Sequence, residues 1–420
     1  MESSSIKKII LENQVRIPGL DVIKRAYDLD SEVNYIFTGQ RRAGKTWFMF
    51  SIIQHFLQQG HSVEEILYIN FEDERLIGLE ITQMDSILDS YRELFSHRPL
   101  LFFDELQNIV GWQKFARRLS DSGYRVYITG SNSTMLSSEM ASTLGGRFLV
   151  KEIETLTFSE FLTFNERSLS PNFEYSDERF EVFRLFESYF NQGGFPELVR
   201  LRDKKEYLST IFQKVFLGDI IARNQIRNTF ALKLLIKKLA ESTMDEVSFT
   251  RIRNIIASTG LQIGTATVIE YERYLEEAFL IASLPNFGSG ISNRESKMKY
   301  YFRDHGLLSL FLVNPESFVL ETMVYNNLRR WFAPNLFYLR DITEVDFYIP
   351  GKLLIQAAWR LDNETTRRRE VASLIKAADK YPAEKLLIIT YDQEEKILVD
   401  NRMIHVLPAW KWMLTNTAED

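Results

Sequence analysis

The chain contains no cysteine and few histidines. Its 420 residues include 0 Cys and only 5 His. The absence of cysteine excludes disulfide bridges and thiolate metal sites. The five histidines stand at positions 55, 61, 97, 305 and 405 and do not show the spacing of metal ligands. We therefore predict structural roles for the histidines.

The sequence also lacks an excess of basic charge and any long hydrophobic run. Its net charge is -6 and its pI is about 5.7, so no overall field attracts nucleic acid. No apolar stretch approaches the roughly 20 residues of a membrane-spanning helix. The first residues, Met1 to Ser5, lack the charged and then apolar layout of a signal peptide. We expect a cytoplasmic protein that does not bind membranes.

Hydrophobic and aromatic residues are plentiful. Hydrophobic residues make up 45% of the chain and aromatic residues 13%, with 31 Phe. This composition favours large packed cores over disorder. A chain of 420 residues is long enough for two or three domains.

One stretch matches a phosphate-binding pattern without a gap. The apolar run Tyr35–Thr38 is followed by G-x-x-x-x-G-K-T, which is typical of a strand, a glycine loop and the start of a helix. Such a loop surrounds a polyphosphate with backbone N–H groups, and the helix directs its positive dipole end at the ligand. We predict that ATP is bound by Gly39, Gln40, Arg41, Arg42, Ala43, Gly44, Lys45, Thr46 and Trp47.

Individual residues of this loop have separate predicted tasks. Gly39 and Gly44 supply backbone angles that side chains disfavour. Lys45 can reach the β- and γ-phosphates, and the Thr46 hydroxyl can bind Mg²⁺. The alternative is an ordinary glycine turn between a strand and a helix.

A pair of carboxylates ends a second apolar run, Leu100–Phe103. Ligands of open α/β sheets bind at the carboxyl ends of the strands. Asp104 is the predicted Mg²⁺ residue, and Glu105 is the predicted group that activates the attacking water. The alternative is a pair of acids that only cap the strand.

Two further candidates rest on weaker patterns. Asn132 or Ser131, after the run Val126–Thr129, would orient water if this strand lies next to the phosphate loop; a plain turn is the alternative. Arg147, preceded by two glycines, is a candidate arginine finger. It would act in cis or from a neighbouring subunit of a homo-oligomer, and the alternative is a surface arginine.

The N-terminal part alternates strands with helices from Val33 onward, which predicts a parallel sheet covered by helices. Before it we expect a short strand at Ile9–Leu11 and a helix at Val22–Tyr27. Beyond Arg147 we expect the strands to stop and helices to follow. The predicted helices there are Phe158–Phe164, Arg179–Phe190 and Tyr207–Ile221.

Residues 229–286 show three helical patterns, of which the last is Thr265–Ile281. The strand Met298–Arg303 follows a glycine-rich turn, and the order suggests a winged helix. The C-terminal part is predicted to contain helices Phe318–Trp331 and Thr365–Asp379 and strands Leu336–Arg340, Glu344–Ile349, Leu353–Ala358 and Lys385–Tyr391.

The whole chain resembles the bacterial and archaeal AAA-type P-loop ATPases that carry a conserved C-terminal region of unknown function. The resemblance rests on the two nucleotide motifs and on residues 144–147 (LGGR), 156–161 (LTFSEF), 193–196 (GGFP), 218–221 (GDII) and 299–304 (KYYFRD). It implies an α/β protein with a P-loop NTPase parallel-sheet core at 1–155, a helical lid at 156–228, a winged helix at 229–314 and a restriction-endonuclease-like α/β domain at 315–420.

The resemblance also implies the layout of a nuclease centre in the last domain. Glu321 lies on the predicted helix, and Glu344 and Asp346 lie on the strand that bears the first acid in that fold. Gln356 stands where the second acid would be, and Ala358 stands where the lysine would be. We therefore predict an inactive centre.

The predicted winged helix is a second candidate for DNA binding. Its recognition helix carries Glu270, Glu276 and Glu277, which repel phosphates. Its wing contains Arg294, Lys297 and Lys299, which could contact them. We expect weak, salt-sensitive DNA binding at most, and a winged helix that packs against protein is the alternative.

The sequence as a whole predicts an Mg²⁺-dependent ATPase that binds ATP and ADP and moves its other domains on an unknown protein partner. The alternative is a nucleotide-regulated DNA-binding or adaptor protein with little ATP turnover.

Overall fold

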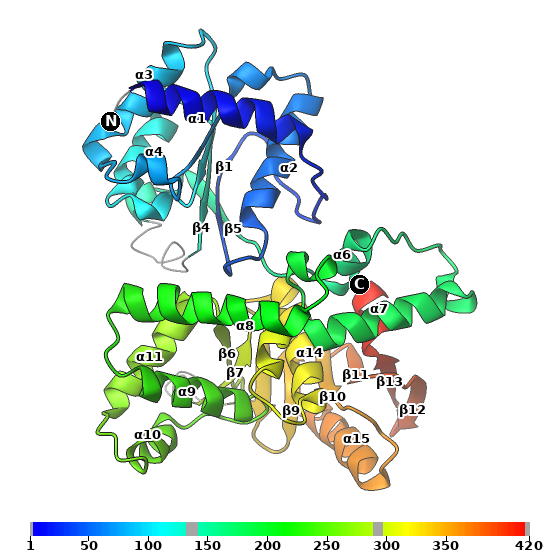
Figure 1. Cartoon of the computed structure of the whole chain (residues 1–420). Helices are drawn as coiled ribbons and strands as arrows, with labels where there is room; N and C mark the ends of the chain where they lie inside the picture. Colours follow the sequence, from blue (N-terminus) through cyan, green and yellow to red (C-terminus); the bar gives the residue numbers. More distant parts are fainter. Residues whose placement is uncertain (1–2, 132–141, 289–296, 416–420) are drawn as a thin grey trace. The chain divides into compact units, whose positions relative to one another are not determined.

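The computed structural model describes residues 3–131, 142–288 and 297–415 (Figure 1). The chain divides into two compact units, Met1–Glu154 and Thr155–Asp420. The predicted boundaries of the ATPase core, the lid, the winged helix and the nuclease-like domain stay predictions.

The first unit is built on a five-stranded sheet in the order β2-β3-β4-β1-β5. Every neighbouring pair is parallel, as the alternation of strands and helices predicted. The strands are β1 (Asn34–Thr38), β2 (Ile66–Asn70), β3 (Leu100–Asp104), β4 (Val126–Gly130) and β5 (Phe148–Glu152).

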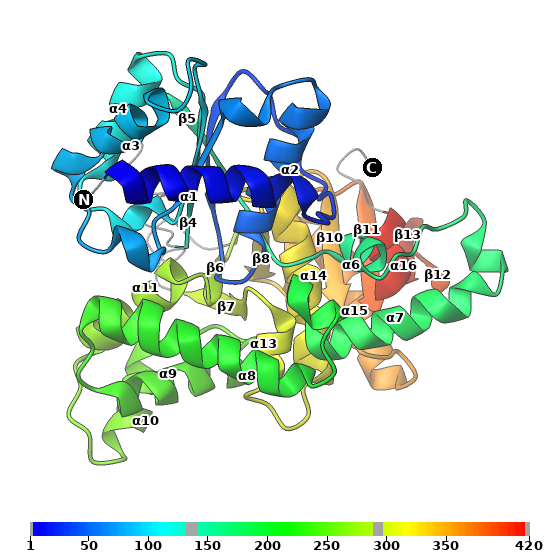
Figure 2. The ribbon, with the colours of Figure 1, turned by 45° about the horizontal axis from the view of Figure 1, so that its top comes forward.

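Helices cover both faces of this sheet because successive strand residues point to opposite sides. In β1, Tyr35 and Phe37 pack against α2 (Lys45–Gln58), while Ile36 belongs to the core of the other face. That other face is covered by α1 (Ser3–Arg16), α3 (Asp85–Arg92) and α4 (Trp112–Asp121). Figure 2 shows α1 lying across the strands.

Three predictions for this unit were wrong. The expected strand Ile9–Leu11 is part of α1, because Ile6, Ile9 and Ile10 recur at helical spacing and are all buried. The expected helix Val22–Tyr27 has no helical turn. The strands do not stop at Arg147, because β5 pairs with β1 at the edge of the sheet. At that edge Leu149 and Val150 are 50% and 39% exposed, so β5 lacks the buried pattern of the central strands.

The second unit contains a mixed six-stranded sheet in the order β12-β13-β11-β10-β9-β8. Its strands are β8 (Phe337–Arg340), β9 (Glu344–Ile349), β10 (Leu353–Ala357), β11 (Lys385–Thr390), β12 (Glu395–Val399) and β13 (Arg402–Pro408). The helix α15 (Glu364–Ala378) packs on one face through Leu374 and Ala377.

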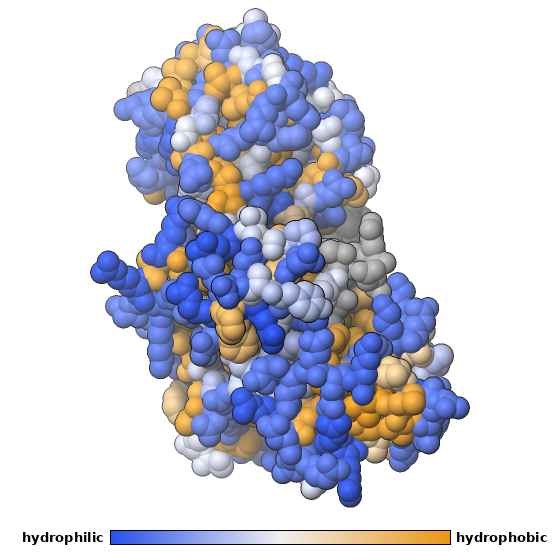
Figure 3. Space-filling view, turned by 90° about the vertical axis from the view of Figure 1, so that its right-hand side faces the viewer, coloured by the Kyte–Doolittle hydropathy of each residue, from blue (hydrophilic) through white to orange (hydrophobic). Residues whose placement is uncertain are grey.

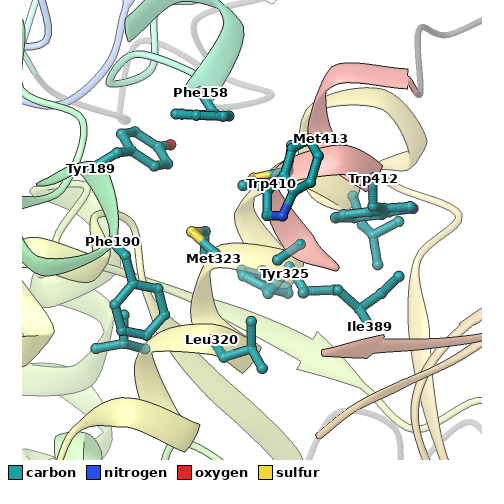
Figure 4. Close-up of a cluster of buried hydrophobic side chains, with 14 of the residues drawn as sticks. Phe158, Tyr189, Phe190, Leu320, Met323, Tyr325, Ile389, Trp410, Trp412 and Met413 are labelled. Carbon is teal, nitrogen blue, oxygen red and sulfur yellow. The ribbon is translucent and has the colours of Figure 1, made fainter. Parts of the chain in front are cut away.

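The other face belongs to a large aromatic core. This core joins residues of α6 (Phe158–Phe164), α7 (Glu178–Gln192), α14 (Glu316–Phe332), β11 and α16 (Ala409–Thr415). Figure 4 shows Phe190 beside Leu320 and Met323 of α14, with Phe158 and Tyr189 above them and Trp410 and Trp412 of α16 to the right. Residues from the predicted lid and the predicted nuclease-like domain therefore share one core.

The remaining elements form a third group of helices with a hairpin. They are α8 (Lys204–Lys214), a π-helical turn at Val215–Ala222, α9 (Thr229–Glu241), α10 (Phe249–Ala257), α11 (Thr265–Glu277), α13 (His305–Ser309) and the antiparallel strands β6 (Ile281–Pro285) and β7 (Met298–Phe302). Three helices followed by a hairpin agree with the expected element order of a winged helix. The predicted helix Thr265–Ile281 was too long, because Phe279 has a φ of 55° and Ile281 already belongs to β6.

Figure 3 shows one face of the molecule, on which hydrophilic side chains predominate and hydrophobic ones gather in separate patches. Within the residues that the structure describes, no helix is long and apolar enough to cross a membrane.

Candidate functional site

The predicted nucleotide residues meet at one edge of the first sheet. The phosphate loop follows β1, the carboxylates Asp104 and Glu105 end β3, and β4 lies between these two strands. The register aligns Thr38 of β1 with Gly130 of β4. The carboxyl ends of β1, β3 and β4 therefore lie next to one another, as expected for a ligand site in a parallel sheet.

The phosphate loop needs its two glycines. Gly39 has a φ of 140°, and a Cβ atom there would lie 2.2 Å from the carbonyl oxygen of Ile153. Gly44 has a φ of 96° and stands directly before the first residue of α2. Both positions are closed to ordinary side chains, the first by a backbone contact and both by conformation.

Lys45 is folded back over its own loop. Its Nζ donates to the carbonyl oxygens of Gly39, at 3.0 Å, and Gln40, at 3.1 Å, and the residue is 5% exposed. Two more polar atoms are buried nearby without a hydrogen-bond partner among the described residues, the Gln40 Nε2 and the Ser131 Oγ. A cation and two available donors fit an anionic ligand such as a polyphosphate.

Asp104 lies at the centre of a hydroxyl network. Its carboxylate accepts hydrogen bonds from the Thr46 Oγ1, at 2.9 Å, the Tyr68 hydroxyl, at 2.8 Å, and the closely placed Thr129 Oγ1. Burial raises the pKa of Asp104, the charge of Glu105 raises it further, and the three hydrogen bonds oppose the rise. A divalent cation would offset the cost of this buried charge, so the carboxylate with the Thr46 hydroxyl fits Mg²⁺.

Glu105 adopts a left-handed backbone conformation, with φ 53° and ψ 41°. Its backbone N–H donates to the Thr129 Oγ1 at 2.9 Å, and its carboxylate accepts a close hydrogen bond from the Gln107 Nε2. Strained backbone of this kind gathers at functional sites, where the surroundings hold it. Thr129 therefore links both acidic residues to β4.

Sequence reasoning missed Tyr68, Thr129 and Arg25. Tyr68 and Thr129 are polar groups inside apolar strands, and that contrast was the available signal. Arg25 is buried, and its Nη1 donates to the carbonyl oxygens of Ala43 and Glu154, each at 2.9 Å. It thus fastens the N-terminal segment to the phosphate loop, a contact that no local pattern predicts.

The other predicted loop residues lie at its surface. The Arg41 guanidinium lies 3.2 Å from a Glu72 carboxylate oxygen. Arg42 has a φ of 66°, and Trp47 is 49% exposed on the first turn of α2. Asn132 lies outside the described residues.

Arg147 is not close to the phosphate loop of its own chain. It stands directly before β5, whose first residue pairs with Asn34 at the start of β1. The phosphate loop begins after Thr38, four residues further on, or about 13 Å along the strand. Arg147 forms a close ion pair with Asp121 at the end of α4. Arg147 therefore lies near the amino ends of the strands, away from the phosphate loop, and its role as an arginine finger stays a prediction.

In the second unit, Glu321 of α14 and Glu344 and Asp346 of β9 lie close together, as the nuclease-like layout predicted. The expectation that Lys299 contacts DNA from a wing was wrong. Lys299 is 0% exposed and its Nζ lies among those three carboxylates. Lys297 is exposed, and Arg294 lies outside the described residues.

Comparison with known proteins gives matches over most of the chain. A model of an AAA domain matches residues 31–162, and a model of a domain of unknown function matches residues 183–317. An uncharacterised protein of Methanocaldococcus jannaschii is 35% identical, and the match covers 98% of this chain and 97% of that protein. An uncharacterised protein of Haemophilus influenzae is 29% identical over 92% of this chain and 95% of its own.

Among solved structures, the chain is similar to a Walker-type ATPase of Pyrococcus abyssi. The identity is 12%, the TM-score is 0.40, and the match covers 74% of this chain and 96% of that one.

Proposed function

Because this chain belongs to the bacterial and archaeal family of AAA-type P-loop ATPases with a C-terminal region of unknown function, we propose that it binds ATP with Mg²⁺ and hydrolyses it. The observation that carries the proposal is the network in which Asp104 accepts hydrogen bonds from Thr46 and Thr129. This network joins the phosphate loop to both other strand ends. A glycine turn or a pair of capping acids would not need such a connection.

The proposed roles follow from these positions. Lys45 exchanges its loop carbonyls for phosphate oxygens, and Thr46 and Asp104 hold Mg²⁺, which neutralises phosphate charge when bound. Glu105 accepts the proton of the attacking water. Thr129 positions both acids, since its Oγ1 contacts the Asp104 carboxylate and the Glu105 N–H.

A second candidate function is a nucleotide-regulated adaptor with little turnover. The contact between the Gln107 amide and the Glu105 carboxylate favours it, because a general base held in this way is less available to water. Phosphate release by the purified full chain, with Mg²⁺ and then with EDTA, distinguishes the two. Metal-dependent turnover that is lost in Glu105→Gln supports the ATPase, whereas ATP binding without turnover supports the adaptor.

We propose that ATP hydrolysis changes the conformation of the chain on a protein partner. A pull-down with Glu105→Gln in the presence of ATP tests this, because that variant should keep ATP and hold the partner. Recovery of the same proteins with Lys45→Ala would argue against a nucleotide-controlled partner.

For DNA we propose weak, sequence-independent binding. With Lys299 buried, Lys297 is the exposed wing lysine among the described residues, and Arg294, which lies outside them, stays a candidate from the sequence. Replacing both should lower the slope of log affinity against log salt by about two units at most. Fluorescence anisotropy on several duplexes across a salt series measures this. A sequence-selective, salt-resistant complex would favour a DNA-binding regulator instead.

A further inference from the structure

The second unit encloses a lysine within a cluster of acids. Lys299 lies on β7 and is 0% exposed, and its Nζ has no hydrogen-bond partner of good geometry. The Nζ lies 3.2 Å from Glu344, 3.7 Å from Asp346 and 3.8 Å from Glu321, measured to one carboxylate oxygen of each. The ammonium therefore occupies a central position among the three acids.

The cluster is buried, so each of its charges needs a partner of opposite sign. Glu321 is 0% exposed; its Oε1 accepts from the Tyr301 hydroxyl at 2.7 Å, and its Oε2 has no hydrogen-bond partner. Burial alone would lower the pKa of Lys299, but its acidic neighbours outweigh it and raise that pKa. Burial also raises the pKa of Glu321, to about 8, and that of Asp346, and the charge of Lys299 opposes both rises. An uncompensated charge at this depth is costly, so the lysine and the acids depend on one another.

The remaining groups of the centre are also engaged. The Gln356 Oε1 accepts from the Asp346 N–H at 2.9 Å, and its Nε2 donates to the Glu344 carbonyl oxygen at 3.2 Å. These bonds continue the pairing of β9 with β10 beyond Ile355, the last residue in the ladder. The Asp346 Oδ2 accepts from the Ala357 N–H at 2.9 Å. The Gln356 amide is therefore held by backbone groups of β9 through both its oxygen and its nitrogen.

The residues present do not fit the divalent metal that a nuclease fold of this type implies. Mg²⁺ requires oxygen ligands at about 2.1 Å in octahedral geometry, and an ammonium already holds the central position. Among the described residues, no group of three or more His, Asp or Glu side chains has an arrangement that could hold a metal.

We infer that Lys299 serves as the built-in cation of the nuclease-like centre, so that the centre takes no divalent metal and instead ties the hairpin β6–β7 to the sheet that carries β9. A lysine from a neighbouring strand thus replaces the metal as the partner of Glu321, Glu344 and Asp346. The centre acts as an internal electrostatic clasp.

The first test measures how Lys299→Met changes the unfolding temperature in two backgrounds. The change should have opposite signs with and without the acids. In the wild-type chain, Lys299→Met leaves the acids without their cation, and the unfolding temperature should fall by about 6 °C or more. In a chain that already carries Glu321→Gln, Glu344→Gln and Asp346→Asn, Lys299 has lost all three acidic partners and is itself the uncompensated buried charge. The same Lys299→Met should raise the unfolding temperature there.

Lys297→Met is the matched control, since Lys297 is exposed two residues away, and it should change neither background by more than about 1 °C. Folding of the acid-depleted chain only when Lys299→Met is also present would support the clasp equally. An equal loss from Lys299→Met in both backgrounds would overturn it, because the lysine would then act by packing.

The second test asks about the metal directly and does not depend on removing Lys299. Tb³⁺ luminescence, sensitised by tyrosines such as Tyr301, is titrated in the full chain with Asp104→Asn to remove the nucleotide-site ligand. We expect the same titration with and without Asp346→Asn. Saturable emission that disappears with Asp346→Asn would show a metal site and contradict the inference.

Discussion

Two lysines near carboxylates give this chain its main contrast. In the first unit, Lys45 lies on the neutral carbonyl oxygens of Gly39 and Gln40, and the nearby Asp104 is bound to hydroxyl groups. In the second unit, Lys299 lies among three carboxylates at 3.2 to 3.8 Å. Carbonyl oxygens can be exchanged for a phosphate, whereas the Lys299 ammonium is enclosed by its acidic partners. The same residue types thus make a ligand site in one unit and a structural contact in the other.

The largest effect that we expect on nucleotide binding comes from Lys45→Ala. Loss of a charge-assisted phosphate contact should weaken ATP binding by about a hundredfold or more. Isothermal titration with a non-hydrolysable ATP analogue measures the change. Lys114→Ala, an exposed lysine of α4, is the control and should bind normally. Affinity within about threefold of the wild type for Lys45→Ala would remove the lysine from the site.

The effect expected for Arg147 is on turnover and not on binding. As an arginine finger supplied in trans, it should contribute roughly a thousandfold to turnover. Arg147→Ala should show this loss only at protein concentrations where copies of the chain assemble. Arg117→Ala is a matched control, because Arg117 also faces Asp121, at 3.8 Å. A change in turnover below about threefold at every concentration would make Arg147 a partner of Asp121 and nothing more.

Thr129→Val tests whether the hydroxyl network does more than hold the fold. Valine keeps the shape but removes the contacts with the Asp104 carboxylate and the Glu105 N–H. We expect turnover to fall by about ten- to a hundredfold, while ATP affinity stays within about threefold. Steady-state kinetics and equilibrium binding give the two values separately. Equal losses in turnover and affinity would place Thr129 in the binding of nucleotide.

The sequence predicted the continuous motifs of the candidate sites but not the contacts between distant elements. The phosphate loop and the acids after β3 were predictable because each is a continuous pattern at a strand end. The burial of Lys299 among acids was not predictable, because its partners Glu321 and Asp346 lie on other elements, α14 and β9. The sequence of β7 is compatible both with an exposed lysine on a wing and with a buried one. Only the packing of β7 against the six-stranded sheet shows that Lys299 is buried.

Two errors in the first unit have the same origin. Ile9 and Leu11 read as strand in a short window, whereas the burial of Ile6, Ile9 and Ile10 against the sheet favours a helix. The edge strand β5 carries exposed Leu149 and Val150, so its sequence does not show the buried run of a central strand. In both cases tertiary packing outweighs the local pattern.

The smallest effect that we expect is a pH-dependent change in stability from Asp104→Asn. Burial raises the pKa of Asp104, so its contribution is present below the ordinary value near 3.8 and is lost as pH rises through the raised pKa. Asparagine does not titrate. Without nucleotide, the unfolding temperature of Asp104→Asn relative to the wild type should therefore rise by a few degrees as the pH increases from near 3.8 through the raised pKa. A constant difference across this range would mean that the carboxylate bears no cost of burial.

The most direct test of the central claim compares binding with hydrolysis in Glu105→Gln. The variant keeps Lys45, Thr46 and Asp104, so ATP should bind as in the wild type and remain uncleaved over many wild-type turnovers. Single-turnover analysis of radiolabelled ATP on the purified full chain with Mg²⁺ measures both quantities in one experiment. Intact ATP on Glu105→Gln and ADP on the wild type is the predicted result. Cleavage at the same rate in both proteins, or in neither, would contradict the account of this edge of the sheet as an ATP-hydrolysing site.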